Sequence, residues 1–227
     1  MRRWGIIITA FYGTVIYVLL FPLFFRLVGT PAYYDSWAST YNYILDEFTF
    51  TEYFLNPWAL LLISGQALLM FISVDTSWRR FKPRRQIQYS VALTALLMAL
   101  LALSIISSLL AAIRGEDGFD LLWGDDWTFI LLWMTLWSVW GCIFYLYYRN
   151  KHYAINNMMS WLFKGSVLGL LIAVPSHVIV RQRGDCSAPI ATSFGIVTGI
   201  AIMFMCFGPG VIALYKKRIE AYQSRTS

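Results

Sequence analysis

The chain has 227 residues, of which 59% are hydrophobic, 18% aromatic and only 13% charged. Soluble globular domains carry roughly 45–50% apolar and about 25% charged residues, so this composition excludes a soluble protein and indicates a lipid-facing surface. The net charge of +6 does not indicate nucleic-acid binding, because the charges are divided between loops rather than gathered in one patch. We therefore expect an all-α, polytopic integral membrane bundle in which residues 1–227 form a single membrane domain.

Six long apolar segments follow one another along the chain, and each can form a transmembrane helix. A helix needs about 20 apolar residues to cross the hydrocarbon core, where it satisfies its own backbone hydrogen bonds. The first segment is too long for the apolar part of a cleaved signal peptide, so we interpret it as an uncleaved anchor. The predicted spans are residues 5–28, 58–76, 88–113, 127–148, 160–181 and 189–214.

The charged residues of the loops predict the orientation of the bundle. Fourteen of the 18 Lys and Arg residues lie on the side that holds both termini, and ten of the 12 acidic residues lie on the other. Basic loops stay in the cytoplasm, so both termini are predicted to be cytoplasmic. We expect the bacterial plasma (inner) membrane, although the same rule orients proteins in the endoplasmic reticulum. The basic run at residues 79–85 is expected to rest against anionic lipid headgroups.

The longest loop, residues 30–56, is predicted to lie outside and is rich in aromatic and acidic side chains. Loops of this length are often functional. Part of the loop can form an interfacial helix on the outer leaflet. Docking to a partner and covering the bundle explain its composition equally well.

Small residues predict where two spans pack. Gly165 and Gly169 form a G-x-x-x-G motif in the fifth span, and Gly195 and Gly199 form another in the sixth. The motif places two glycines on one helix face, so that backbones can approach closely. We expect these two spans to pack on each other, with a face for a partner protein as the alternative.

Two further features of the spans have structural explanations. Trp133, Trp137 and Trp140 form one helical stripe in the fourth span, which we interpret as a lipid-facing or interhelical ridge rather than a quinone- or porphyrin-stacking surface. Gly208-Pro209-Gly210 interrupts the sixth span, where proline removes a backbone hydrogen bond. We expect a kink or an early helix end there, and a broken helix of the transporter kind is the alternative.

The densest group of reactive side chains lies at the outer ends of the fifth and sixth spans. Ionisable groups at membrane depth are costly, and they are functional candidates by default. We expect a network of ion pairs here, in which Arg181 and Arg183 meet Asp185 and the acidic loop 116–126. The candidate site residues are His177, Arg181, Arg183, Asp185 and Cys186.

Three chemical alternatives use the same residues. His177, Asp185 and Cys186 carry the imidazole, carboxylate and thiolate ligands that suit zinc or copper, with His177 and Cys186 as the metal candidates. Cys186 can also act as a nucleophile with His177 as its base. In an oxidising exterior Cys186 can instead form an intermolecular disulfide.

Common cofactors find little support in the sequence. The acidic loop lacks the calcium-binding pattern of an EF-hand. The second histidine, His152, is predicted on the cytoplasmic side, which argues against bis-histidine haem ligation. We therefore expect no cofactor.

These observations favour a non-enzymatic accessory or assembly subunit that acts through contacts with other membrane components. Its expected partners are the lipid bilayer and either another membrane protein or further copies of the chain, without nucleic acid. A membrane enzyme or redox and metal-binding protein with a site at the outer ends of the fifth and sixth spans is the alternative. The third hypothesis is a small transporter.

Overall fold

The computed structural model describes residues 2–29, 36–75, 84–148 and 154–226, and every regular element in these ranges is a helix. The predicted all-α membrane bundle is therefore confirmed. The elements are α1 (Arg2–Thr14), the π-helix η1 (Val15–Leu20), α2 (Phe21–Val28), α3 (Trp37–Glu47), α4 (Phe50–Phe54), α5 (Pro57–Asp75), α6 (Arg84–Arg114), α7 (Glu116–Trp123), α8 (Asp126–Tyr148), α9 (Ala154–Arg183) and α10 (Ala188–Thr226).

Five helical segments of the described chain are long and apolar enough to cross a membrane. Four coincide with a predicted span to within three residues at each end, and the fifth starts one residue before the predicted span 189–214 and ends at Phe207. The span predicted at residues 58–76 corresponds to α5, which has 19 residues and a length of about 28 Å. Its described apolar stretch, Pro57–Leu69, is shorter than the other five, so the count of six stays a prediction. The five are Gly5–Val28, Gln88–Arg114, Trp127–Tyr147, Asn157–Arg183 and Ala188–Phe207.

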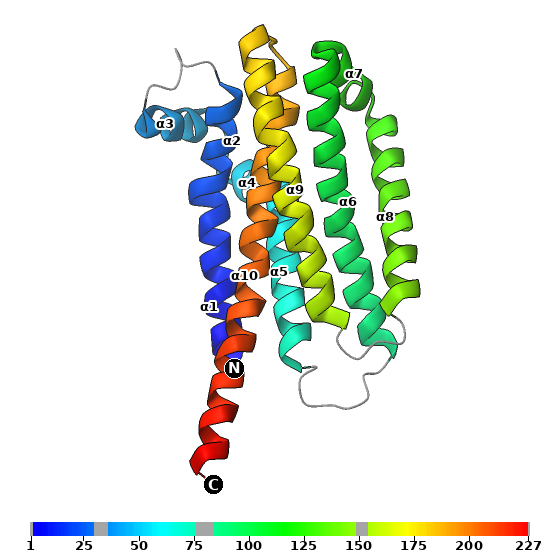
Figure 1. Ribbon diagram of the computed structural model, residues 1–227. Helices are drawn as coiled ribbons and strands as arrows, with labels where there is room; N and C mark the ends of the chain where they lie inside the picture. Colours follow the sequence, from blue (N-terminus) through cyan, green and yellow to red (C-terminus); the bar gives the residue numbers. More distant parts are fainter. Residues whose placement is uncertain (1, 30–35, 76–83, 149–153, 227) are drawn as a thin grey trace.

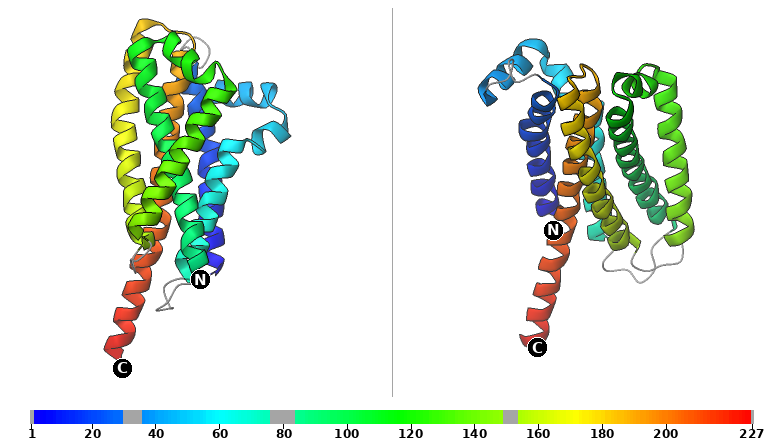
Figure 2. Two further views of the ribbon diagram at one scale, coloured as in Figure 1. Left: turned by 90° about the vertical axis from the view of Figure 1, so that its right-hand side faces the viewer. Right: turned by 45° about the horizontal axis from the view of Figure 1, so that its top comes forward.

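The spans run side by side, with α6 packed against α8, α9 and α10 (Figure 1). At the other edge of the bundle α1, η1 and α2 pack against α5 and α10, as Figure 2 shows from two further sides. The N-terminus and C-terminus lie at the same end, as an even number of crossings requires. We call the opposite end, which carries α3, α7 and the turn between α9 and α10, the outer end. Its location outside the cytoplasm stays a prediction from the loop charges.

The two glycine motifs behave differently. On α10, a Cβ at Gly199 would lie 3.0 Å from Leu170 of α9, so this motif does pack on α9 as predicted. On α9, however, Gly165 and Gly169 face α6, where a Cβ would meet the side chains of Met98, Leu101 and Ile105 at 3.5 Å or more. The predicted packing of the two spans on each other is confirmed, because α9 and α10 are in contact, but the glycines of the two motifs do not face each other. Helix α9 turns its own glycines to α6 and presents Leu170 and Ala173 to the glycines of α10.

The tryptophan stripe of α8 faces α6. The indole Nε1 of Trp137 donates to the backbone carbonyl of Ala92 at 3.0 Å, and Trp140 packs against Phe144 and the buried core. The stripe is thus an interhelical ridge, one of its two predicted structural roles. In α10 the helix continues through Gly208-Pro209-Gly210 to Thr226, so the expected early helix end is wrong.

The long outer loop folds into α3 and α4, each of which begins with a capping box. Ser36 and Ser39 cap α3 reciprocally, and Thr49 and Glu52 do the same for α4. The Thr49 hydroxyl, 2.8 Å from Glu52 Oε2, and the Thr49 backbone amide lower the pKa of the Glu52 carboxyl. These local signals explain why a loop of this composition is helical.

Candidate functional site

The candidate residues lie at the outer end of the bundle, where α9 turns into α10 (Figure 1). His177 and Arg181 are in the last turns of α9, whereas Asp185 and Cys186 occupy the turn that follows. Gly184 begins this turn with a φ of +77°, a left-handed conformation that glycine adopts easily and that commonly ends helices. The turn therefore brings the ends of two spans together at one short connection.

His177 connects α9 to α10 through a buried hydroxyl. Its Nδ1 lies 2.8 Å from Oγ1 of Thr192, and that hydroxyl in turn donates to the carbonyl of Pro189 at 3.1 Å. Since the threonine proton is used by Pro189, Thr192 accepts a hydrogen bond from Nδ1–H. This assignment selects the tautomer in which Nε2 of His177 carries the lone pair, and Nε2 is the atom left for any proton transfer.

Arg181 binds the end of a different span. Its Nη2 donates to the carbonyls of both Leu27 and Gly29, at the C-terminus of α2. The last carbonyls of a helix lack intrahelical donors and carry partial negative charge, so a guanidinium satisfies them and complements the helix dipole. Arg181 thereby fastens the first span to the fifth.

A carboxylate at the start of α7 binds the turn before α10. Oε1 of Glu116 accepts from the backbone amide of Cys186 at 2.8 Å. Beside it, Gly115 has a φ of +67°, and a Cβ there would lie 3.1 Å from Oδ2 of Asp185. Glycine is therefore needed at Gly115 for its conformation and for the close approach of Asp185. Both carboxylates lie near the N-terminus of α10, where the helix dipole stabilises negative charge.

The expected ion-pair network is not what closes this end. Among the side chains that the structure describes, no Lys or Arg lies within ion-pair distance of an Asp or Glu, and Arg183 is exposed. Arg181 and Glu116 bind backbone carbonyls and an amide instead. The reason is geometric, because the C-termini of α2 and α9 and the N-termini of α7 and α10 meet here, and each presents unsatisfied backbone groups.

The metal and nucleophile hypotheses gain no support from this geometry. Within the described ranges, no group of three or more His, Cys, Asp or Glu side chains could hold a metal ion. His177 is directed to Thr192 inside the contact between α9 and α10, while the Cys186 thiol is free and exposed on the turn. Each residue remains a candidate on its own chemistry, with Nε2 of His177 as a base and the thiol of Cys186 as a nucleophile.

A second polar cluster, which the sequence did not reveal, supports the first span. The hydroxyl of Tyr53 donates to the carbonyl of Tyr17, and the hydroxyl of Tyr41 donates to the carbonyl of Val18. Both carbonyls belong to η1, where the change from i−4 to i−5 bonding disturbs the regular helical ladder. In return the Tyr17 hydroxyl donates to the carbonyl of Phe54 at 2.7 Å. Burial raises the pKa of Tyr53 to about 12.

A stripe of small side chains on α8 was also missed. Thr135, Ser138 and Cys142 are exposed and share one face, at positions i, i+3 and i+7. This spacing could have been found in the sequence, but the tryptophan stripe on the same helix dominated its pattern.

Comparison of the chain with protein-family models, curated protein sequences and solved structures found no match. The chemical groups available at the outer end are one imidazole nitrogen and one exposed thiol. The other candidate side chains with described contacts serve helix ends and turns. Surfaces, rather than this cluster, therefore offer the better basis for a functional assignment.

Proposed function

We propose that this protein is a non-enzymatic accessory or assembly subunit of the bacterial plasma membrane, which binds a transmembrane helix of another membrane protein on the outward face of α8. The observation that carries the proposal is the stripe of small side chains on that face. We call it the α8 stripe, and its members are Thr135, Ser138 and Cys142.

The α8 stripe lies opposite the tryptophan ridge. With 100° per residue, its three members lie within about 60° of one another, on the side of the helix that points away from Trp137 and Trp140. The hydroxyls of Thr135 and Ser138 donate to carbonyls of their own helix at 2.7 and 2.8 Å. The side chains on this face are therefore small. Their hydroxyl groups are hydrogen-bonded within the helix, so they can lie in hydrocarbon.

Small residues at the centre of an exposed membrane face favour a helix as the neighbour. Helix association in lipid depends on close packing, and Gly, Ala, Ser and Thr allow two backbones to approach, whereas lipid tails gain nothing from them. Among the five long spans described, α8 is the least buried, and it packs mainly against α6 at the edge of the bundle (Figure 2). The exposed side chains of Val139 and Leu146 border the stripe and can flank an incoming helix.

The outer-end contacts support the same proposal. Arg181 and Glu116 bind backbone groups of other elements, so two of the charged groups there serve to hold the bundle together. A rigid bundle with a free helix face suits a protein that positions another membrane protein. The loop charges support an orientation with both termini in the cytoplasm, which is compatible with the plasma membrane.

The test is recovery of the tagged protein from native membranes in a mild detergent, with its size and composition measured. The wild type should co-purify with a defined membrane protein. Ser138→Trp fills the stripe and should release that partner, while the protein remains monodisperse. Ala10→Trp, at an exposed position on α1, is the matched control and should retain the partner.

Native Cys142 allows a second measurement, because it lies exposed within the stripe. A photo-crosslinker attached to its thiol in membranes should capture the same partner, and Cys142→Ser should abolish that product. Recovery of the wild type as a lone species, or crosslinking only to a second copy of the chain, would overturn the accessory-subunit proposal.

A further inference from the structure

Helix α3 lies across the outer end of the first span and projects from the bundle (Figures 1 and 2). Two contacts hold it there. The guanidinium of Arg26 on α2 lies over the indole ring of Trp37, 4.8 Å from its centroid. The hydroxyl of Tyr41 reaches the carbonyl of Val18 on η1. The position of α3 relative to the first span is therefore determined by two side chains from the N-terminal half of the helix.

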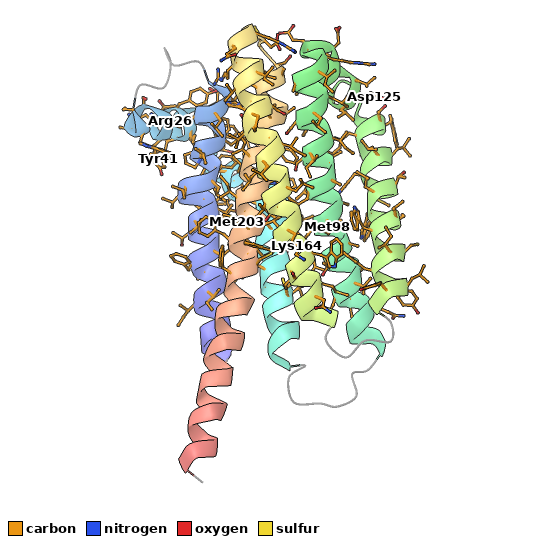
Figure 3. All side chains as sticks on the ribbon, viewed as in Figure 1. Arg26, Tyr41, Met98, Asp125, Lys164 and Met203 are labelled. Carbon is orange, nitrogen blue, oxygen red and sulfur yellow. The ribbon has the colours of Figure 1, made fainter. Side chains whose placement is uncertain are left out.

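The Tyr41 contact identifies which side of α3 faces the cytoplasmic end of the bundle. Val18 precedes the end of α2 by several helical turns, so Tyr41 must extend from α3 back along the span, as Figure 3 shows. Ala38 and Leu45 lie three residues before and four residues after Tyr41, so they share its side of the helix. That side is apolar, and Leu45 is 75% exposed in the isolated chain.

The opposite side of α3 is polar. Ser39 and the exposed Asp46 project from it beside Tyr43, while the exposed Asn42 lies at its border with the apolar side. Between the two sides, Thr40 and Ile44 are buried against the protein. The helix thus has an apolar side that faces along the spans and a polar side that faces away from them. This is the pattern of a helix lying in a membrane interface.

The length of the first span places α3 at the edge of the hydrocarbon. From Gly5 to Phe24 the chain covers 20 residues, or about 30 Å, which equals the thickness of a typical hydrocarbon core. Arg26 follows directly, at headgroup depth, and its contact with Trp37 keeps α3 at that level. Below α3, Val18 and Leu19 are exposed on η1 and continue the lipid-facing surface of the span.

We propose that α3 is an interfacial helix that binds the outer leaflet of the bilayer, with Ala38 and Leu45 among the acyl chains and Asp46 in the headgroup layer. Helix α3 carries two carboxylates, Asp46 and Glu47, and no Lys or Arg. It therefore fits a zwitterionic lipid surface better than an anionic one. This contact is independent of the partner site proposed on α8.

Hydroxyl-radical footprinting of the unmodified protein tests the proposal. The purified chain is placed in phosphatidylcholine nanodiscs, one copy to a disc, and oxidation of individual leucines is measured by mass spectrometry. Three leucines form a matched set, because their intrinsic reactivity is the same. Leu45, Leu131 and Leu121 are 75%, 64% and 53% exposed in the isolated chain, and Leu121 lies on α7 at the outer end.

Lipid cover should reverse the order that these exposures predict. We expect Leu121 to be oxidised fastest and Leu45 to be as protected as Leu131, which lies within the membrane span of α8. Buried Leu62 reports that the protein is folded and should stay unmodified. Oxidation of Leu45 as fast as that of Leu121 would overturn the proposal. Since the disc holds one copy of the chain and only the scaffold protein at its rim, a native partner protein cannot account for the protection.

Discussion

Nδ1 of His177 on α9 and Oγ1 of Thr192 on α10 lie 2.8 Å apart, near the outer turn that joins the two helices. The histidine is half-buried and the threonine is fully buried. Polar groups at this depth cost free energy unless they are paired, so the contact stabilises the junction of the two spans.

Thr192→Val keeps the shape of the side chain but removes the partner of His177. We expect the free energy of unfolding to fall by about 1–2 kcal/mol, because a partly buried ring nitrogen loses its hydrogen bond. Thermal unfolding in nanodiscs measures the change. Thr14→Val is the matched control, since its exposed hydroxyl bonds only to the carbonyl of Ala10 in its own helix. Equal effects of the two substitutions would contradict the assigned role.

Arg181→Ala should detach the end of α2 from α9. Two carbonyls lose their charged donor, so we expect a loss of about 1–3 kcal/mol in stability. Arg183→Ala, which removes an exposed guanidinium two residues away, should leave the melting temperature nearly unchanged. If both variants behave alike, net charge rather than capping of α2 is the property that matters.

Tyr53→Phe tests the cluster around η1. The substitution keeps the ring contacts with Tyr17 and Phe21 but removes the donor to the Tyr17 carbonyl. We expect a destabilisation of about 1–2 kcal/mol, measured by thermal unfolding, because the carbonyl lies where water is scarce. Tyr89→Phe, at an exposed position on α6, serves as the control and should be neutral.

The raised pKa of Tyr53 predicts a pH dependence at the alkaline end. Burial favours the neutral phenol in the folded state, with a pKa of about 12 against the ordinary value of 10.0. The contribution of the neutral Tyr53 phenol to the free energy of unfolding is therefore complete below pH 10 and declines as the pH rises towards about 12. The difference in stability between wild type and Tyr53→Phe should shrink over this window. A difference that stays constant from neutral pH upwards would contradict the prediction.

Gly195→Ala should weaken the meeting of α6, α9 and α10. A Cβ there would overlap the hydroxyl of Ser108 and lie 3.1 Å from the Cβ of Ala173. We expect a loss of about 1–3 kcal/mol through overpacking, visible as a lower melting temperature. Gly165→Ala has ordinary contacts from 3.5 Å, so it should be neutral or stabilising through its helix propensity. The two variants together distinguish the effect of close packing on stability from the effect of helix propensity.

The spans could be predicted because crossing a membrane is a property of consecutive residues. Predicted span 127–148 and observed helix Asp126–Tyr148 agree to within a residue, since apolar length and flanking charges determine both. Which neighbouring helix each helix face contacts could not be predicted in the same way. The spans that carry the two glycine motifs pack on each other as expected, but Gly165 and Gly169 themselves meet α6, because a motif defines a small face without defining its neighbour.

The candidate site shows the same division. His177, Arg181 and Cys186 were identified because ionisable and reactive groups are rare in an apolar chain. Their partners are distant in sequence, with separations of 15, 154 and 70 residues to Thr192, Leu27 and Glu116. Two of these contacts use backbone atoms, which every residue possesses, so no side-chain pattern could indicate them.

By itself the sequence determined that the protein is a helical membrane bundle, where its spans run and which side chains are chemically unusual, because lipid imposes these constraints locally along the chain. Only the tertiary structure decided that Arg181 caps α2, that tyrosines support η1, and which faces of α3 and α8 stay free. These outcomes depend on which helix termini and faces meet, and that choice follows from packing the whole bundle at once.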